Sequence, residues 1–334
     1  MCDNPLGLSN KSAPQRDGPG ALSLRGTVFH EEWWLNASTG GRYEEVVVKA
    51  GANVVGRLPY VAHRKLGFTT LGMPPMTHIL GPVVDPGEGK PQTQLVRRLS
   101  IVRELIDKLP RHDHFKQALG SPLPDALAFQ DRGFNTHPQF NFLIDCGADL
   151  KQTWDGMHFK ARQHIRRAEE KFSVTSVDDP AEFLQFYYAN LTELGRRSFT
   201  RLEPFPLLLT ACRDRGCGEV VCARWPDGKP AAMTFLVWDN RSMYYLLSTR
   251  AKGPGDNGSV NLLIWEAIKR ANALKILFDF DGVYSSGAAR FLSSFGGDIN
   301  IRMFAERATH IYRVARFTKR RLIGGVAMES LSFT

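Results

Sequence analysis

Long apolar segments are absent from this chain of 334 residues. No run reaches the roughly 18 to 20 apolar residues that a membrane-spanning helix requires. The first twenty residues are polar, contain proline and glycine, and lack the apolar stretch of a secretory signal peptide. We therefore expect a cytoplasmic protein whose residues 1–22 form a disordered tail.

Cysteine is scarce, with five residues in the whole chain. An odd number without a signal peptide argues against a disulfide framework. Cys212, Cys217 and Cys222 are spaced at equal intervals, but this spacing matches neither a zinc knuckle nor the common iron–sulfur patterns. We therefore expect no metal site.

Two further groups of motifs are missing. There is no G-x-x-x-x-G-K-[ST] phosphate loop, which disfavours ATP hydrolysis. The nine histidines are scattered, and none accompanies a G-x-S-x-G nucleophile motif. His112 and His114 have the spacing of a metal pair, but they follow a helix-ending proline and are interpreted as a solvated turn.

The charge balance, in contrast, is strongly basic. The chain has 43 Lys and Arg residues and 34 Asp and Glu residues, which gives a formal net charge of +9. Such a balance favours phosphate-bearing partners: a nucleotide cofactor, RNA or anionic lipid. A solvated basic surface without a partner is the alternative.

Hydrophobic periodicity divides the chain into two blocks, 23–150 and 151–325, followed by a flexible tail at 326–334. Each block runs helix, antiparallel strands, helix, strand, so the pattern predicts a pseudo-duplicated α+β architecture. The first block is expected to hold a short helix at 27–38, strands within 43–73, a helix at 92–109 and two strands within 126–145. The second is expected to hold a basic helix at 153–172, a strand at 173–177, a helix at 180–195, three strands within 218–249, a helix capped by Ser259 and a buried strand at 275–282.

A glycine-containing loop between a strand and a helix is the first candidate site. It carries Arg250, Lys252, Gly253 and Gly255, in the pattern R-x-x-G-x-G. Glycine allows close backbone approach to a phosphate, and the N-terminus of the following helix offers free N–H groups. This arrangement predicts a pyrophosphate site. A simple turn followed by a helix cap is the alternative.

A pair of carboxylates at the end of the buried strand is the second candidate. Asp279 and Asp281 are two residues apart, so a regular strand would place them on one face. Mutual repulsion would raise one pKa, as a general base requires. Tyr284 nearby is a candidate proton donor. Alternatively, Asp281 forms a turn, Asp279 accepts backbone hydrogen bonds and Tyr284 is packed.

The basic helix is the third candidate. Arg162 and Arg166 are four residues apart and therefore share a helical face. Paired guanidinium groups bind phosphates or carboxylates well. Alternatively, the helix is solvated and its arginines pair with Glu169 and Glu170.

Four ordered segments resemble a known family: WDGMHFKARQHIRRAEEKF, DGKPAAMTFLVWDNRSMYYLLST, NLLIWEAIKRANA and FDFDGV…ARFLSSFGG. They resemble the FemAB-like acyltransferases, including the BioF2-like family, of the GNAT superfamily. The resemblance covers about residues 25–320 and is sharpest over 154–297. It implies two tandem GNAT-like domains, transfer of an acyl or aminoacyl group to an amine, and binding of the coenzyme A pyrophosphate by the loop of Arg250, Gly253 and Gly255.

One segment departs from the family pattern. Fem-type peptidyltransferases carry a lysine in F-K-x-x-F-G, where it is thought to support the acyl carbonyl in tRNA-dependent members. Here Leu292 occupies that position, and Arg290 would leave the chain on a different side. The departure disfavours an aminoacyl-tRNA donor.

The sequence therefore predicts N-acyl transfer from acyl-CoA to an amine of a small molecule or sugar. Backbone N–H groups near residues 244–247 would polarise the acyl carbonyl. Asp279 or Asp281 would act as base, with Asp279 favoured, and Tyr284 or Tyr245 would protonate the leaving thiolate. The alternatives are an aminoacyl-tRNA-dependent peptidyltransferase of the Fem type and a non-catalytic relative that binds RNA or a membrane surface.

Overall fold

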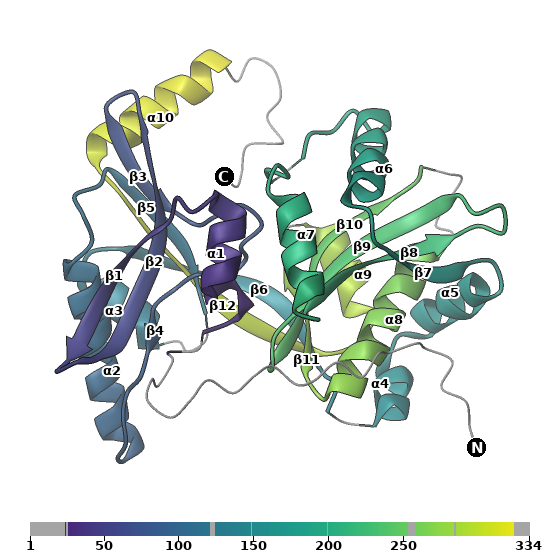
Figure 1. The fold of residues 1–334 in the computed structure, drawn as a ribbon, viewed down its shortest axis with the longest axis horizontal. Helices are drawn as coiled ribbons and strands as arrows, with labels where there is room; N and C mark the ends of the chain where they lie inside the picture. Colours follow the sequence, from purple (N-terminus) through teal and green to yellow (C-terminus); the bar gives the residue numbers. More distant parts are fainter. Residues whose placement is uncertain are drawn as a thin grey trace.

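A single mixed sheet of 12 strands runs through the molecule, with helices on both of its faces (Figure 1). The computed structural model describes residues 24, 26–120, 124–147, 149–198, 200–252, 258–283 and 285–323. The strand order is β1-β2-β3-β5-β12-β6-β11-β10-β9-β8-β7, and β4 pairs with β2. The expected α+β class is therefore confirmed.

The described residues of the first half of the chain form a meander, three α-helices and a short 3-10 helix. The β1–β2 hairpin turns at Gly51, whose φ of 63° suits glycine, and Pro91 opens the long helix at a position where no N–H is needed. Its elements are η1 (Val28–His30), α1 (Glu32–Thr39), β1 (Glu44–Ala50), β2 (Asn53–Lys65), β3 (Phe68–Gly72), β4 (Val83–Val84), α2 (Pro91–Asp107), β5 (His114–Leu119), α3 (Pro124–Asp131) and β6 (Asn135–Asp145).

The second half alternates helices with strands. Its elements are α4 (Leu150–Gly156), α5 (Phe159–Glu169), β7 (Ser173–Val177), α6 (Pro180–Glu193), α7 (Phe205–Asp214), β8 (Gly218–Arg224), β9 (Pro230–Trp238), β10 (Ser242–Arg250), α8 (Ser259–Leu274), β11 (Leu277–Gly282), α9 (Ser286–Ser293), β12 (Asp298–Ala308) and α10 (His310–Ile323). Helices α5 and α8 share one apolar core with the sheet, while α6 and α7 share another on its opposite face.

Three local predictions are wrong. The first of the two strands expected within 126–145 is helix α3, because its short apolar run is buried as a helix against α2. His114 is buried at the start of β5 and does not lie in a solvated turn. The basic segment 153–172 is divided between two helices, since Met157 adopts an extended conformation between α4 and α5.

An element near each end of the chain packs with the opposite half of the molecule. Strand β12 pairs with β5 through residues 303–308 and with β6 through 298–306, so the last strand completes the first half of the sheet. In return, α1 packs against α7 of the second half. The predicted domain boundary near residue 150 stays a prediction. The strands before and after residue 150 do not form two separate parts of the sheet, because β12 lies between β5 and β6.

A candidate site where two strands part

Strands β10 and β11 part after a short parallel pairing. Their register runs from Ser242 and Leu277 to Tyr244 and Asp279, and β10 then continues to Arg250 paired with β9 on its other side. The register between β10 and β9 also shifts between residues 245 and 247. Backbone groups beyond the pairing therefore have no partner in this ladder, and N–H groups in such a gap can donate to a carbonyl oxygen.

Both predicted carboxylates lie beside this gap, and one arginine connects them. Asp279 and Asp281 are buried, and Arg302 of β12 donates one hydrogen bond to each, both at 2.5 Å. Asp281 has a φ of 62°, and the pairing of β11 with β6 is irregular there. The regular alternation assumed from the sequence is therefore wrong, but the two side chains still converge because Arg302 reaches both.

Asp279 has hydrogen bonds on both of its oxygens. Asn141 and the backbone N–H of Asp281 donate to Oδ1, each at 2.8 Å, and Arg302 donates to Oδ2. Asn300 donates to Asn141 at 2.9 Å and extends the network to β12. The bond from the backbone of Asp281 is of the kind that the structural alternative predicts, and together with the side-chain bonds it fixes the orientation of Asp279.

The expected increase in pKa is wrong for Asp281. Burial alone would raise the pKa of this carboxyl, but the nearby His78 and Arg302 hold it well below its usual range. Mutual repulsion of the carboxylates does not dominate, because Arg302 lies between them. Asp281 is consequently a weak base that stays ionised.

His78 is a site residue that sequence analysis missed. Its Nδ1 lies 2.6 Å from Oδ2 of Asp281, which is an ion-pair distance without the angle of a hydrogen bond, and its ring stacks on Phe29. Only 12% of the His78 side chain is exposed. An imidazole beside an ionised carboxylate can accept a proton, as in catalytic triads. No local motif surrounds His78, so only the distant partner Asp281 reveals it.

Of the two tyrosines predicted as proton donors, Tyr245 is among the described residues and Tyr284 is not. Tyr245 lies in β10 where the strands part, and its ring faces Phe280 of β11 at a centroid distance of 6.5 Å. Burial raises the pKa of Tyr245 to about 12, so its hydroxyl stays protonated at neutral pH.

The glycine loop has the expected strand–loop–helix placement. Arg250 and Lys252 are exposed at the end of β10, while Gly253 and Gly255 lie outside the described residues. Helix α8 begins at Ser259, and its N-cap is Gly258 rather than the expected Ser259. Gly258 has a φ of 78°, which accounts for glycine at this position.

The start of α8 lies against α5. A Cβ atom on Gly258 would stand 2.7 Å from the carbonyl oxygen of His164 in α5. In the first turn of α8, Asn261 is buried and its Oδ1 has no hydrogen-bond partner among the described residues. Helix N-termini favour anions, and a buried polar atom without a hydrogen bond is typical of a ligand site.

The two arginines of α5 turn toward α4. Arg162 lies 3.6 Å from Asp155, and the guanidinium of Arg166 lies 5.6 Å from the ring centre of Trp154. The pairing with Glu169 and Glu170 is not found. Both arginines share a face, as predicted, and stay accessible enough to meet an anionic ligand.

A cavity of about 560 Å³ lies between the two halves. Its walls include Arg42, His63 and Pro75 of the first half and Arg201 of the second. Partial burial, together with Arg201 and Arg42, lowers the pKa of His63. Pro75 precedes His78 by three residues in the chain, but His78 itself is not among the residues that line this cavity.

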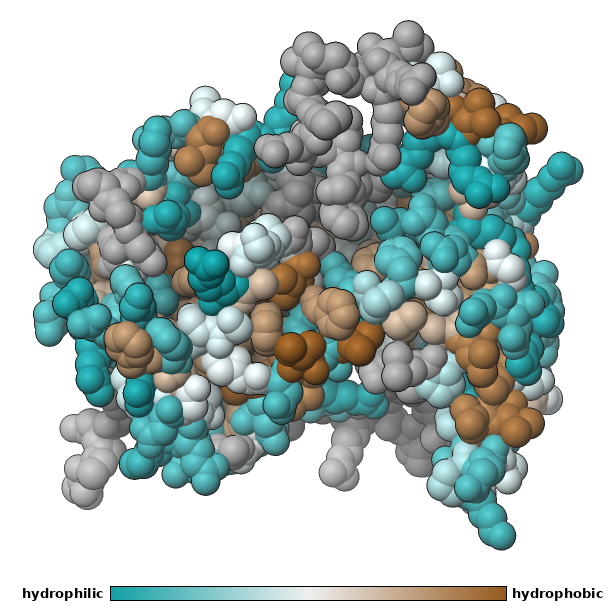
Figure 2. Space-filling model, turned by 180° about the vertical axis from the view of Figure 1, so that it is seen from behind, coloured by the Kyte–Doolittle hydropathy of each residue, from teal (hydrophilic) through white to brown (hydrophobic). Residues whose placement is uncertain are grey.

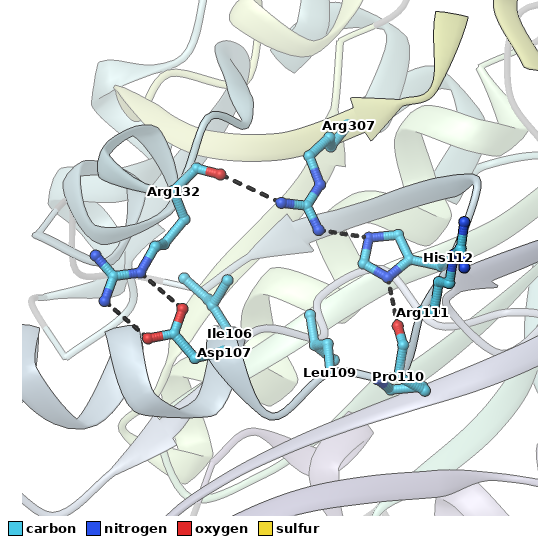
Figure 3. A pocket seen from close by; sticks show the side chains of 8 residues that line it. All are labelled: Ile106, Asp107, Leu109, Pro110, Arg111, His112, Arg132 and Arg307. Atoms are coloured by element: carbon cyan, nitrogen blue, oxygen red, sulfur yellow. Dashed lines mark hydrogen bonds and ion pairs between the residues drawn. The ribbon is translucent and has the colours of Figure 1, made fainter. Parts of the chain in front are cut away.

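A smaller cavity of about 300 Å³ lies at the far end of α2 (Figure 3). Its polar groups satisfy one another: Arg307 donates to the backbone oxygen of Arg132 and to His112, and Arg132 pairs with Asp107. This network is structural and is separate from the strand gap.

Metal and membrane motifs are absent from the described part of the chain. Within it, no three His, Cys, Asp or Glu side chains gather as a metal site would require. No described helix is long and apolar enough to cross a membrane.

Leu292 and Arg290 are oriented as the sequence indicated. Leu292 is buried among apolar side chains that include Phe280 and Phe295, while Arg290 is exposed on α9. Neither side chain supplies a cation to the buried interior at this point.

Comparisons with known proteins agree with this geometry. Residues 159–291, from α5 to α9, match the family model of the acetyltransferase (GNAT) domain. No curated protein sequence matches the chain significantly.

Three solved structures share the fold over most of the chain. FemX superposes with a TM-score of 0.65 at 14% identity, over 89% of this chain and 94% of FemX. The C-terminal DUF2156 domain of an Agrobacterium fabrum protein gives 0.54 at 17% identity, over 88% and 93%. L-PGS from Bacillus licheniformis gives 0.53 at 12% identity, over 87% and 91%. The second half of the chain thus contains the expected GNAT domain, and the chain shares its fold over most of its length with these three structures.

Proposed function

We propose that this protein transfers an acyl group from acyl-CoA to an amine of a small molecule or sugar that also carries a negative charge. One observation carries the proposal: β10 and β11 part directly beside the buried pair of His78 and Asp281. The gap supplies donors for an acyl carbonyl, and the pair supplies an acceptor for the proton of an amine.

The donor would bind along the second half. Its diphosphate would meet the N-terminus of α8, the loop of Arg250, Lys252, Gly253 and Gly255, and the arginines of α5. The contact of Gly258 with His164 supports this arrangement, because it brings α5 to the start of α8. The unpartnered oxygen of Asn261 offers an acceptor for a donor group of the ligand.

The acceptor would enter through the cavity between the halves. Its walls carry Arg42 and Arg201 against one carboxylate, Glu203, and this excess of cations suits an anionic group such as a phosphate or carboxylate. The amine would then attack the acyl carbon while His78 takes its proton, and Asp281 would hold the imidazole and stabilise its positive charge. Asp279 would act indirectly, by fixing Arg302 and the end of β11.

The leaving group requires a proton of its own. When the carbon–sulfur bond breaks, the electron pair goes to the thiolate of coenzyme A. Tyr245 stays protonated at neutral pH and lies in the gap, so it is our candidate donor to this thiolate; Tyr284 is the other.

Aminoacyl-tRNA is the alternative donor, and the net charge of +9 favours it. The buried Leu292 disfavours it, since the resemblance places a lysine there in tRNA-dependent relatives. RNA binding would weaken steeply with salt, whereas an acyl-CoA site would saturate at one ligand per chain.

The test is a release assay for free coenzyme A with acetyl-CoA and longer acyl-CoAs, run against a panel of amines with and without a phosphate or carboxylate. We expect release that depends on both substrates and saturates with phosphorylated or carboxylated amines. Acyl transfer from aminoacyl-tRNA with no turnover of any acyl-CoA would overturn the proposal, and so would one-to-one coenzyme A binding without transfer to any amine.

A further inference from the structure

The last helix, α10, presents apolar side chains to solvent. Ile311, Val314 and Phe317 are 71%, 52% and 57% exposed, and their spacing places them on one helical face. The opposite face is fixed to the sheet: Tyr312 stacks on His114 at 4.9 Å and meets Phe68 edge-on. The apolar face is therefore held outward by a well-packed inner face.

A cation flanks this apolar face. Arg313 is exposed, whereas Arg316 lies 3.6 Å from Glu306 of β12, and the helix sequence HIYRVARFTKRRLI contains no acidic residue. A helix with such a division of apolar and basic residues is typical of surfaces that bind anionic membranes.

The turn between β2 and β3 extends the same surface. Leu66 at this turn is 84% exposed, and Arg64 and Lys65 beside it are exposed as well. The turn lies beside α10 in Figure 1, and the contact of Phe68 with Tyr312 connects them. Figure 2 shows hydrophobic residues gathered at the upper right, the end of the molecule that carries α10.

We propose that the exposed apolar side chains of Leu66, Ile311 and Val314 bind the surface of an anionic lipid bilayer, together with the cations Arg64, Lys65 and Arg313 around them. We call this set the α10 surface. The apolar side chains would enter the boundary between headgroups and acyl chains, while the arginines and lysines pair with lipid phosphates. The proposal is independent of the acyltransfer chemistry, because none of these residues contributes to the strand gap or the cavity between the halves.

The chemistry of this surface favours a bilayer over two other occupants. A second copy of the chain would bring equal cations together, which repel. A nucleic acid would engage the cations but leave the apolar side chains in water. A bilayer with anionic headgroups satisfies both kinds of side chain at once.

The experiment is sedimentation of the full chain with vesicles of phosphatidylcholine alone or mixed with phosphatidylglycerol at about 7:3. The test variant is Ile311→Asp with Val314→Asp. The matched control is Leu95→Asp with Val96→Asp, which adds the same charges at exposed positions of α2, far from the α10 surface. We expect the wild-type chain and the control to bind the anionic vesicles, and the test variant to bind at least tenfold more weakly.

A fluorescent variant gives a second measurement that does not depend on losing binding. In Val314→Trp, the added indole should shift its emission to the blue with anionic vesicles, and lipids brominated near the headgroup should quench it. Absence of wild-type binding, equal binding by the test variant, or an unshifted indole would overturn the proposal. So would loss of binding when tRNA is added in excess, or self-association that the test variant abolishes.

Discussion

At the scale of single residues, the chemistry of the site depends on which cation neutralises the carboxylates of Asp279 and Asp281. Two buried carboxylates without a cation would share a proton, and one would have a raised pKa. Arg302 prevents this, since its guanidinium lies 2.5 Å from an oxygen of each carboxylate. Asp281 therefore functions better as the orienting group of an imidazole than as the base itself.

This assignment predicts distinct effects of neighbouring substitutions. His78→Gln removes the proton acceptor and should lower turnover by roughly 100-fold or more, with acyl-CoA affinity nearly unchanged. Asp281→Asn should lower turnover as well, because the imidazole loses its partner and preferred tautomer. Steady-state kinetics and a separate acyl-CoA titration check both. Wild-type turnover in the His78 variant would remove it from the mechanism.

His30 predicts a stability change with pH. It is buried, Thr27 N–H donates to its Nδ1, and its Nε2 lies 3.2 Å from the Gly81 carbonyl oxygen, which suits a neutral ring. Burial, aided by Arg57, lowers its pKa to about 4. The unfolded chain binds the proton near pH 6.5 and the folded chain only near 4, so stability should fall as pH decreases through that window, by roughly 3 kcal/mol in all.

Urea unfolding at a series of pH values measures this effect, and His30→Gln provides the comparison. Between pH 6.5 and 4, the variant should lose less stability than the wild-type chain. Parallel curves for the two proteins would show that His30 is not the responsible group.

The candidate carboxylates were predictable from sequence, whereas His78 was not. Asp279 and Asp281 end a recognisable apolar strand before a glycine, and that local pattern marks them. His78 lies in an irregular loop. Only its contact with Asp281, about two hundred residues later in the chain, marks it as a site residue. Arg302 was missed for the same reason, because nothing near it in the chain indicates two buried carboxylates.

At the scale of elements, α5 and the start of α8 form one unit. Gly258 admits no side chain because the carbonyl oxygen of His164 lies so close, and the arginines of α5 follow on the same helix. The periodicity of α5 and the glycine loop were both visible in the sequence. Their contact was not, because it joins residues almost a hundred positions apart.

A double substitution on α5 tests this unit. Arg162→Ala with Arg166→Ala should raise the KM for acyl-CoA roughly tenfold, about 1.4 kcal/mol, because two cations near the diphosphate are lost. The melting temperature should stay nearly constant, since both side chains are at least partly exposed. Lys160→Ala with Arg167→Ala, on the exposed side of the same helix, is the control and should change neither quantity. A lower melting temperature with an unchanged KM would make the arginines structural.

At the scale of the whole molecule, the ends of the chain connect the halves. β12 lies between β5 and β6, and its Arg302 neutralises the carboxylates of β11 in the second half. The strands themselves were largely predictable from alternation and turn residues. The exchange of β12 and α1 between halves was not, because the pairing of His114 with Glu306 spans 192 residues and leaves no periodic signal.

This exchange predicts that the halves fold as one unit. A chain ending at residue 297 lacks β12, so β5 and β6 lose their shared neighbour and two buried carboxylates lose Arg302. An uncompensated buried charge costs about 3–5 kcal/mol, which is a large part of the 5–15 kcal/mol that stabilises a typical domain. We expect this chain to lack a cooperative unfolding transition in both halves.

The matched truncation ends at residue 309, after β12 and before α10. It keeps Arg302 and every strand pairing of β12, and it loses only the helix that packs on Phe68 and His114. We therefore expect it to unfold cooperatively, to retain acyl-CoA binding and to lose binding to anionic vesicles, as measured by circular dichroism, titration and sedimentation. If the chain ending at 297 kept a folded second half that bound acyl-CoA, β12 would belong to the first half alone, and the carboxylates would have to be neutralised without Arg302.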